Sequence, residues 1–209
     1  MITQDKASQE NITPELALRV LKQGNERFVQ QKALTRDHLA QVKQTTSGQF
    51  PFAVVLGCID SRVPTELIFD QGFGDIFNVR IAGNCVNHDV LGSLEFSCKV
   101  AGAKLVVVLG HTQCGAVKGA CDGVELGNLT ALLNKIQPAI NETKEPSDPS
   151  QRNAANAQFV EAVAENNVHH SLQEILTKSP ILKEMRDAGD IALVGAIYDV
   201  GTGKVAFDE

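Results

Sequence analysis

Two nearly continuous apolar runs, each ending in glycine, constrain the fold of this chain more than any other feature. The first covers residues 52–57 (Phe-Ala-Val-Val-Leu-Gly) and the second covers residues 104–110 (Lys-Leu-Val-Val-Val-Leu-Gly). A strand with one face in water alternates apolar and polar residues, whereas a strand covered on both faces is apolar throughout. Both runs therefore predict buried strands of a parallel sheet.

The rest of the chain alternates between helical and strand patterns. Thr13-Pro14 predicts a helix start, because a hydroxyl cap precedes a proline at the first helical position. We expect a tail at 1–12, a loop at 145–150, helices at 14–31, 36–44, 88–101, 114–121, 127–138 and 153–177, and further strands at 76–80, 191–198 and 204–207, the last two forming a hairpin. This alternation predicts an α/β fold with a central, mostly parallel sheet flanked by helices.

Length and composition exclude several classes of protein. The 209 residues favour a single domain, and 43% hydrophobic with 21% charged residues is ordinary for a globular protein. The net charge of −6 argues against nucleic acid as a partner, and no apolar run approaches the length that spans a membrane. The polar N-terminus shows no secretory leader, so we expect a cytoplasmic protein, or a periplasmic one if a leader has been removed.

Five cysteines, an odd number, cannot all pair within the chain. Their spread does not resemble a small disulfide-rich scaffold, so a reducing compartment is the simpler interpretation. Cys85, Cys98 and Cys121 are interpreted as small buried hydrophobes. Four histidines are expected at the surface: His38, His88, His169 and His170. Nothing in the sequence selects one of them as a proton relay.

Each of the two apolar runs leads into residues that bind metals. Cys58 follows the first glycine, and His111 and Cys114 follow the second. Ligands bind beyond the carboxyl ends of parallel strands, so the three side chains converge if the two strands are neighbours. Two thiolates and an imidazole suit Zn²⁺, and three protein ligands leave the fourth position open, as in catalytic zinc sites.

Asp60 and Arg62 lie two and four residues beyond Cys58. A carboxylate at this place can accept a hydrogen bond from metal-bound water, and Arg62 can keep that carboxylate ionised and turned from the metal. We therefore assign Asp60 and Arg62 catalytic roles.

Non-enzymatic interpretations are also open. A thiol redox module would want a Cys-x-x-Cys pair, but Cys114 and Cys121 are seven residues apart and Cys58 has no near partner. A structural zinc site would need a fourth firm ligand, for which Asp60 is the nearby candidate. The Gly72-Phe73-Gly74 stretch lacks the third glycine and the helix start of a dinucleotide-binding loop.

The motif Cys58-x-Asp60-Ser61-Arg62, followed 53 residues after Cys58 by His111-x-x-Cys114-Gly115, resembles the β-class carbonic anhydrases. The resemblance runs from about Gly48 to Gly119 and includes residues 78–84, Asn-Val-Arg-Ile-Ala-Gly-Asn. It implies zinc held by Cys58, His111 and Cys114. It also implies reversible hydration of carbon dioxide to bicarbonate and a proton, by attack of zinc-bound hydroxide. The sequence at 195–200 resembles the final core strand of the family.

The resemblance also implies an arrangement of subunits. One domain of residues 1–209 is expected, with a helical arm at 1–45 that wraps a partner and an α/β core at 46–209. The family unit is a homodimer, often paired into a tetramer, with active sites at the subunit boundary. The residues placed by the resemblance around the small substrate pocket are Gln49, Phe77, Ala82, Phe96 and Gly115, of which Gln49 reaches the neighbour's site.

One departure from the family pattern bears on regulation. Some members close the zinc site with the aspartate and bind bicarbonate beside a tryptophan, an arginine and a tyrosine. Here Arg80 and Tyr198 match, but Val55 stands in place of the tryptophan. We therefore expect a permanently open site without that bicarbonate pocket.

Two expectations concern the reaction itself. Two thiolates cancel the charge of the metal, so bound water should have a pKa above neutral and activity should rise with pH. The alternative function is a carbon disulfide or carbonyl sulfide hydrolase, because such enzymes resemble the family and use the same zinc scaffold.

Overall fold

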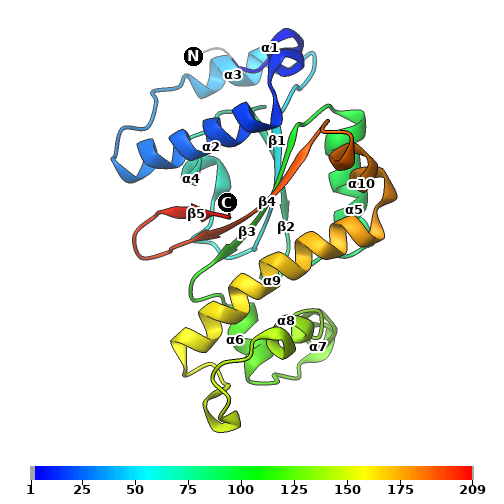
Figure 1. The fold of residues 1–209 in the computed structure, drawn as a ribbon. Coiled ribbons are helices and arrows are strands. Elements are labelled where there is room, and N and C mark those ends of the chain that lie inside the picture. The colour runs from blue at the N-terminus through cyan, green and yellow to red at the C-terminus, as the bar shows by residue number, and fades with distance from the viewer. Residues whose placement is uncertain (1–2, 209) are drawn as a thin grey trace.

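A five-stranded sheet forms the centre of the molecule (Figure 1). The computed structural model describes residues 3–208, and its strands lie in the order β2-β1-β3-β4-β5. The strands are β1 Ala53–Gly57, β2 Ile76–Arg80, β3 Leu105–His111, β4 Ala192–Tyr198 and β5 Val205–Phe207. The first four run parallel, and β5 pairs with β4 in antiparallel fashion. The predicted α/β fold with its mostly parallel sheet and terminal hairpin is confirmed.

Helices cover both faces of the sheet, which explains why β1 and β3 are apolar throughout. Successive side chains of a strand point to opposite faces. Val55 and Val107 face α2 (Pro14–Val29) and α4 (Thr65–Ile68), whereas Val54 and Val106 belong to the opposite core. That opposite core is formed with α5 (His88–Glu95), its π-helical continuation η2 (Phe96–Val100), α9 (Ala157–Lys178) and α10 (Pro180–Asp187).

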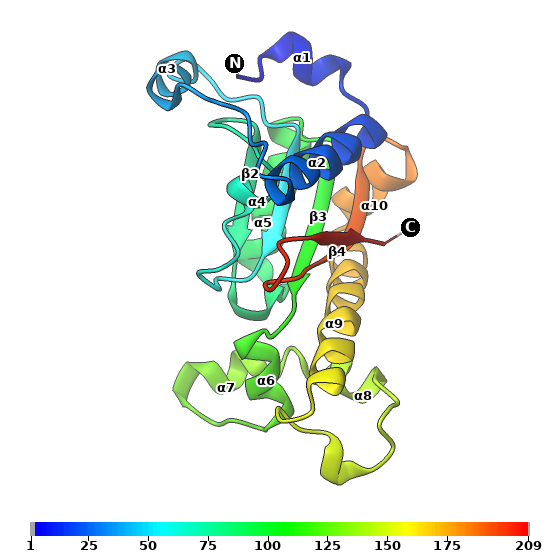
Figure 2. The same cartoon turned by 90° about the vertical axis from the view of Figure 1, so that its left-hand side faces the viewer.

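A further group of helices lies beyond the carboxyl ends of the parallel strands (Figures 1 and 2). It consists of α6 (Gly115–Cys121), α7 (Gly127–Leu133), α8 (Gln137–Glu142) and the first part of α9. A short turn of 3-10 helix, η3 (Pro149–Gln151), follows α8 within the expected loop. The core of this group includes the thiols of Cys58 and Cys114. The ends of the strands and this group of helices thus enclose the predicted ligands.

The N-terminal residues lie at the opposite end of the sheet (Figure 2). The prediction of a tail at 1–12 is wrong for its second half, because residues Lys6–Asn11 form helix α1. Met1 and Ile2 lie outside the described residues. Asp5 and Ser8 form a capping box. Buried Gln9 donates hydrogen bonds from Nε2 to the carbonyls of Pro51 and Ala101, both at 2.8 Å. These long-range bonds fix a segment whose local sequence shows no apolar periodicity.

Other helices differ from the sequence expectations in detail. The helix predicted at 127–138 is two helices, α7 and α8, while α3 (His38–Gln44) agrees with the helix predicted at 36–44. Helices α4 and α10 were not predicted. The start of α10 repeats the signal of α2, because Ser179 caps the helix and Pro180 occupies its first position. Among residues 3–208, none of the helices has the length and apolarity needed to cross a bilayer.

Helix α2 packs against the turn that follows α4 at a point where only glycine fits. A Cβ atom on Gly24 would overlap the carbonyl oxygen of Phe69, which is backbone and cannot easily move. Buried Ala17 and Leu21 on the same helix contribute to the core of the sheet.

Gly24→Ala is therefore expected to lower the free energy of unfolding by about 1–3 kcal/mol, the usual cost of overpacking. In an unobstructed helix the same change would stabilise by about 1 kcal/mol, so the sign is diagnostic. Chemical denaturation measures the difference. Gln23→Ala, at the exposed neighbour, is the control and should change stability by no more than about 0.5 kcal/mol. A stabilising Gly24→Ala would contradict the close packing of α2.

Candidate metal centre

The three predicted ligands converge at the carboxyl edge of the sheet. Cys58 directly follows β1, His111 is the last residue of β3, and Cys114 caps the start of α6. Strands β1 and β3 are parallel neighbours, with Gly57 opposite Leu109. The ligand atoms of Cys58, His111 and Cys114 all lie within 4.8 Å of one another, and all three residues are buried. This is the one such cluster found among the described residues 3–208.

The distances and free valences of the cluster fit a tetrahedral metal ion. Sγ of Cys58 and Sγ of Cys114 are 4.0 Å apart. Zinc–sulfur bonds of about 2.3 Å in a tetrahedron would place the two sulfurs about 3.8 Å apart. Nε2 of His111 is fully buried and has no hydrogen-bond partner. A buried nitrogen without a partner is costly, and a metal bond would satisfy it.

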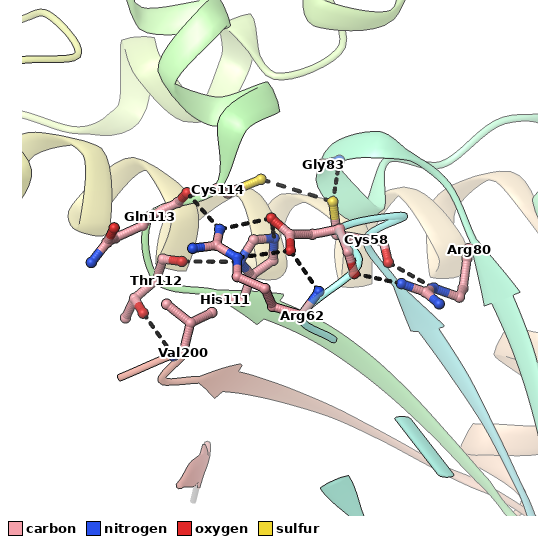
Figure 3. Close-up of polar contacts among 10 residues, drawn as sticks. Cys58, Arg62, Arg80, Gly83, His111, Thr112, Gln113, Cys114 and Val200 are labelled. Carbon is pink, nitrogen blue, oxygen red and sulfur yellow. Dashed lines mark hydrogen bonds and ion pairs between the residues drawn. The ribbon is translucent and has the colours of Figure 1, made fainter. Parts of the chain in front are cut away.

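The backbone orients His111 for this role. Nδ1 of His111 lies 2.9 Å from the carbonyl oxygen of Thr112, which can only accept, so Nδ1 carries the proton and the lone pair is on Nε2. Thr112 is itself held by the terminal hairpin, because Val200 donates its N–H to Oγ1 at 3.1 Å (Figure 3). Gln113 turns the chain through a positive φ of 56° and so brings Cys114 back toward His111.

The two ligand thiols share their protons unequally. A hydrogen bond from the Cys114 thiol lowers the pKa of Cys58 well below its ordinary value. The same bond, together with burial, raises the pKa of Cys114. The pair therefore favours one thiolate before any metal arrives, and binding would release the remaining proton.

Asp60 and Arg62 form a two-pronged ion pair beside the cluster. Arg62 donates from its backbone N–H and Nε to Oδ1, both at 2.9 Å, and from Nη2 to Oδ2 at 2.8 Å. These bonds hold the pKa of Asp60 far below its usual range. Oδ2 lies 3.9 Å from Nε2 of His111. The carboxylate is thus ionised, turned onto Arg62, and next to the ligand atoms without joining them.

Arg80 has a contact that sequence reasoning missed. It donates from Nε to the carbonyl of Cys58 at 2.9 Å and from Nη2 to the carbonyl of Asp60 at 2.6 Å (Figure 3). The guanidinium at the end of β2 therefore clamps the loop that presents both residues. The motif contained Arg80, but its bonds go to backbone, for which side-chain patterns give no signal.

The remaining three thiols lie outside the ligand cluster, and that of Cys85 donates to the carbonyl of Gly83 at 3.4 Å. Burial raises the pKa of Cys85 and of Cys98 to about 12, and that of Cys121 to about 11. Such thiols are almost entirely protonated at neutral pH and react poorly. All five cysteines are free thiols, and the sulfurs of Cys58 and Cys114, 4.0 Å apart, belong to the ligand cluster.

The residues expected around a substrate pocket lie in three different places. Phe77 and Phe96 meet edge to face, with ring centroids 6.2 Å apart, and line an open hollow with Arg80. Ala82 begins the short turn η1 (Ala82–Asn84) and Gly115 begins α6, both adjoining the buried ligand cluster. Gln49 lies beyond the amino end of β1, at the opposite edge of the sheet. Within one chain, Gln49 is not brought to the cluster.

Comparison with known proteins supports one family. The family model described as carbonic anhydrase matches residues 53–205. The chain is 36% identical to carbonic anhydrase 2 of Mycobacterium tuberculosis over 203 residues, which covers 93% of this chain and 92% of the relative.

Solved structures agree with this result. The crystal structure of the β-carbonic anhydrase CafA of Aspergillus fumigatus is 29% identical, with a TM-score of 0.72, covering 93% of this chain and 90% of that chain. One of two tetrameric β-carbonic anhydrases from Sordaria macrospora shares the fold at 24% identity, with a TM-score of 0.70, covering 88% of this chain and 93% of that chain. From the family match, the relative aligned over nearly its whole length and the shared fold, we conclude that the chain belongs to the β-class carbonic anhydrase family.

Proposed function

We propose that this protein catalyses the reversible hydration of carbon dioxide to bicarbonate and a proton, with Zn²⁺ held by Cys58, His111 and Cys114. The observation that carries the proposal is the partnerless Nε2 of His111 between two thiols, beside a carboxylate that is engaged by Arg62. Three donors with the aspartate held aside leave one coordination position for a reactant. This is the pattern of a catalytic zinc site and not of a closed structural one.

Zinc, when bound, lowers the pKa of water so that a nucleophile for carbon dioxide is available near neutral pH. Cys58 and Cys114 supply two negative charges, which offset the charge of the ion and weaken this acidifying effect. The thiolates therefore favour an enzyme whose activity increases with pH. With its Nδ1 proton on the carbonyl of Thr112, His111 would bind the ion through the lone pair of Nε2 and add no charge of its own.

Asp60 is proposed to orient the attacking water. As an ionised carboxylate it can only accept hydrogen bonds, so a water beside it turns a hydrogen toward Asp60 and a lone pair toward the substrate. Arg62 maintains this state, because it stabilises the anion and occupies both carboxylate oxygens. Arg80 fixes the backbone on either side of Ile59 and so restricts where the carboxylate lies.

Carbon dioxide is small and uncharged, so an apolar pocket is sufficient to hold it. We assign this role to Phe77, Ala82, Phe96 and Gly115. Gln49, at the opposite edge of the sheet in its own chain, would contribute only from a second subunit. This placement supports the proposal that the active site is shared between subunits.

We accordingly propose that the protein forms a homodimer. Two such dimers could pair into a tetramer, the state named for the Sordaria macrospora enzymes. The edge of β2 is unpaired in this chain, and Leu67, Phe73 and Phe96 are about half exposed or more near that edge. Unpaired strand edges and exposed apolar side chains favour association. We keep residues 1–45 as the arm and 46–209 as the core. Helix α3 is the part left to reach a partner, since α2 packs on its own sheet and Gln9 ties α1 to Pro51 and Ala101 of the same chain. The five free thiols support the cytoplasm as our proposed compartment.

Sedimentation velocity tests the dimer. The native protein is expected to sediment as a dimer or larger, and Phe73→Asp should shift it toward monomer, because a charge would be buried at the contact. Glu165→Asp, at an exposed position of α9, is the control and should leave the distribution unchanged. A native protein that is monomeric at micromolar concentration would contradict the proposal.

Asp60→Asn should retain zinc and lose most carbon dioxide hydration, by about 100-fold or more, the range for removing a positioned proton acceptor. An amide can present an N–H where a carboxylate accepts, so water would be turned the wrong way. Stopped-flow hydration with measured zinc content checks this. Asp187→Asn breaks a similar Asp–Arg contact on α10 and should have full activity. Full activity in zinc-replete Asp60→Asn would refute the orienting role.

Cys58→Ala should lose the metal, because two remaining ligands hold zinc poorly. Metal analysis of purified, dialysed protein measures the zinc per chain. Cys121→Ala, which removes a thiol outside the cluster, should retain the native content. Stoichiometric zinc in folded Cys58→Ala would show that the ligand assignment is wrong.

A further inference from the structure

The thiol of Cys58 receives a hydrogen bond from the turn η1 as well as from Cys114. The N–H of Gly83 points at Sγ of Cys58 over 3.3 Å (Figure 3). We propose that Asn167, on α9, is a positioning residue of the metal centre: it holds Gly83 so that this N–H donates to the Cys58 thiolate. This inference rests on the proposed metal site, though not on the reaction that the site performs.

Gly83 occupies a left-handed conformation, which favours glycine, in a closely packed space. Its φ of 68° and ψ of 20° lie in the left-handed region. A Cβ atom here would lie 2.8 Å from Cδ1 of Ile136 and 3.3 Å from Cβ of Ala116. The turn is therefore pressed between the start of α6 and the residue before α8. The direction of the Gly83 N–H and C=O groups depends in addition on the hydrogen bonds that they make.

Helix α9 supplies those hydrogen bonds from behind the turn. Asn167 donates from Nδ2 to the carbonyl of Gly83 at 2.8 Å, and Ser171, one turn later, donates from Oγ to the carbonyl of Asn84 at 3.2 Å. Asn167 is 1% exposed and Ser171 is 2% exposed. Asn167 thus bonds the residue whose N–H meets Cys58, with Sγ of Cys85 as a longer second donor at 3.4 Å, whereas Ser171 bonds the residue that follows.

Asn167 is a costly choice for a position in this core. Its Oδ1 is buried without a hydrogen-bond partner, and an unsatisfied amide oxygen costs about 1–3 kcal/mol. Its neighbours Val163, Ala164 and Val168 are buried apolar residues, so an aliphatic side chain would suit the surroundings better. The contact of Asn167 with Gly83 is the feature that accounts for an amide here.

The consequence for the metal centre is electronic as well as geometric. An N–H that donates to a thiolate withdraws charge from sulfur and fixes its direction. Mutating a hydrogen-bond partner of a metal ligand typically lowers metal affinity or activity by about 10-fold to 100-fold. Arg80 clamps the carbonyl of Cys58 from β2, while Asn167 acts on its sulfur from α9 through Gly83.

Asn167→Leu and Ser171→Ala form a matched pair for the test, because each removes one buried bond from α9 to η1. We expect Asn167→Leu to bind zinc about 10-fold more weakly in chelator competition. In the cobalt(II)-substituted protein, its sulfur-to-cobalt charge-transfer band should move to lower energy, because the thiolate loses a donor. Ser171→Ala should leave both quantities near native values. Native values in Asn167→Leu, or equal changes in both variants, would overturn the proposal.

A second measurement needs no substitution and, if Asn167→Leu fails to fold, tests the Gly83 N–H···S bond on which the inference depends. The native chain, loaded with the NMR-active isotope of cadmium, should show coupling between the metal and the Gly83 amide proton across the N–H···S bond. Absence of that coupling would overturn the inference. These readouts involve no carbon dioxide, so a metal-loaded protein without hydration activity would refute the proposed function and leave this inference standing.

Discussion

The parallel pairing of β1 with β3 is the interaction on which the rest of the structure depends. It brings two strand ends to one edge of the sheet and so places Cys58 next to His111 and Cys114. The pairing is stable because helices bury both faces of the two strands. Burial on that scale leaves β1 without a polar residue and β3 with His111 alone at its end, so the chemistry is confined to the carboxyl ends of the strands and the first residues beyond them.

Three separate parts of the fold then restrain the ligand cluster. Arg80 on the edge strand clamps the loop after β1, the terminal hairpin holds Thr112 and through it His111, and α9 supports Gly83 behind Cys58. The charges around the ligand cluster also suit a bound cation. Negative charge gathers on the thiol pair and on Asp60, whereas the positive charge of Arg62 lies on the outer side of Asp60. The arrangement favours a cation at the cluster and keeps the carboxylate from serving as its fourth ligand.

The sequence predicted the sheet, most helices and the convergence of the three ligands, because these follow from local patterns: apolar runs, caps and short spacings. Contacts between distant residues were not predictable in this way. Gln9 fixes α1 by bonds to Pro51 and Ala101, and Asn167 meets a residue 84 positions away. Neither has a local signature. The pocket residues came from family resemblance alone, and Gln49, at the far edge of the sheet, could join the others only from a second subunit.

The central claim is that an open zinc site hydrates carbon dioxide. Its most direct test is stopped-flow hydration by the native protein, from about pH 6.5 to about pH 9, with zinc content measured on the same sample. The account predicts fast turnover at one zinc per chain, rising smoothly with pH. A sharp loss of activity below about pH 8 would show instead that Asp60 closes on the metal. No hydration at full zinc occupancy would contradict the account and favour the sulfur-substrate hydrolase.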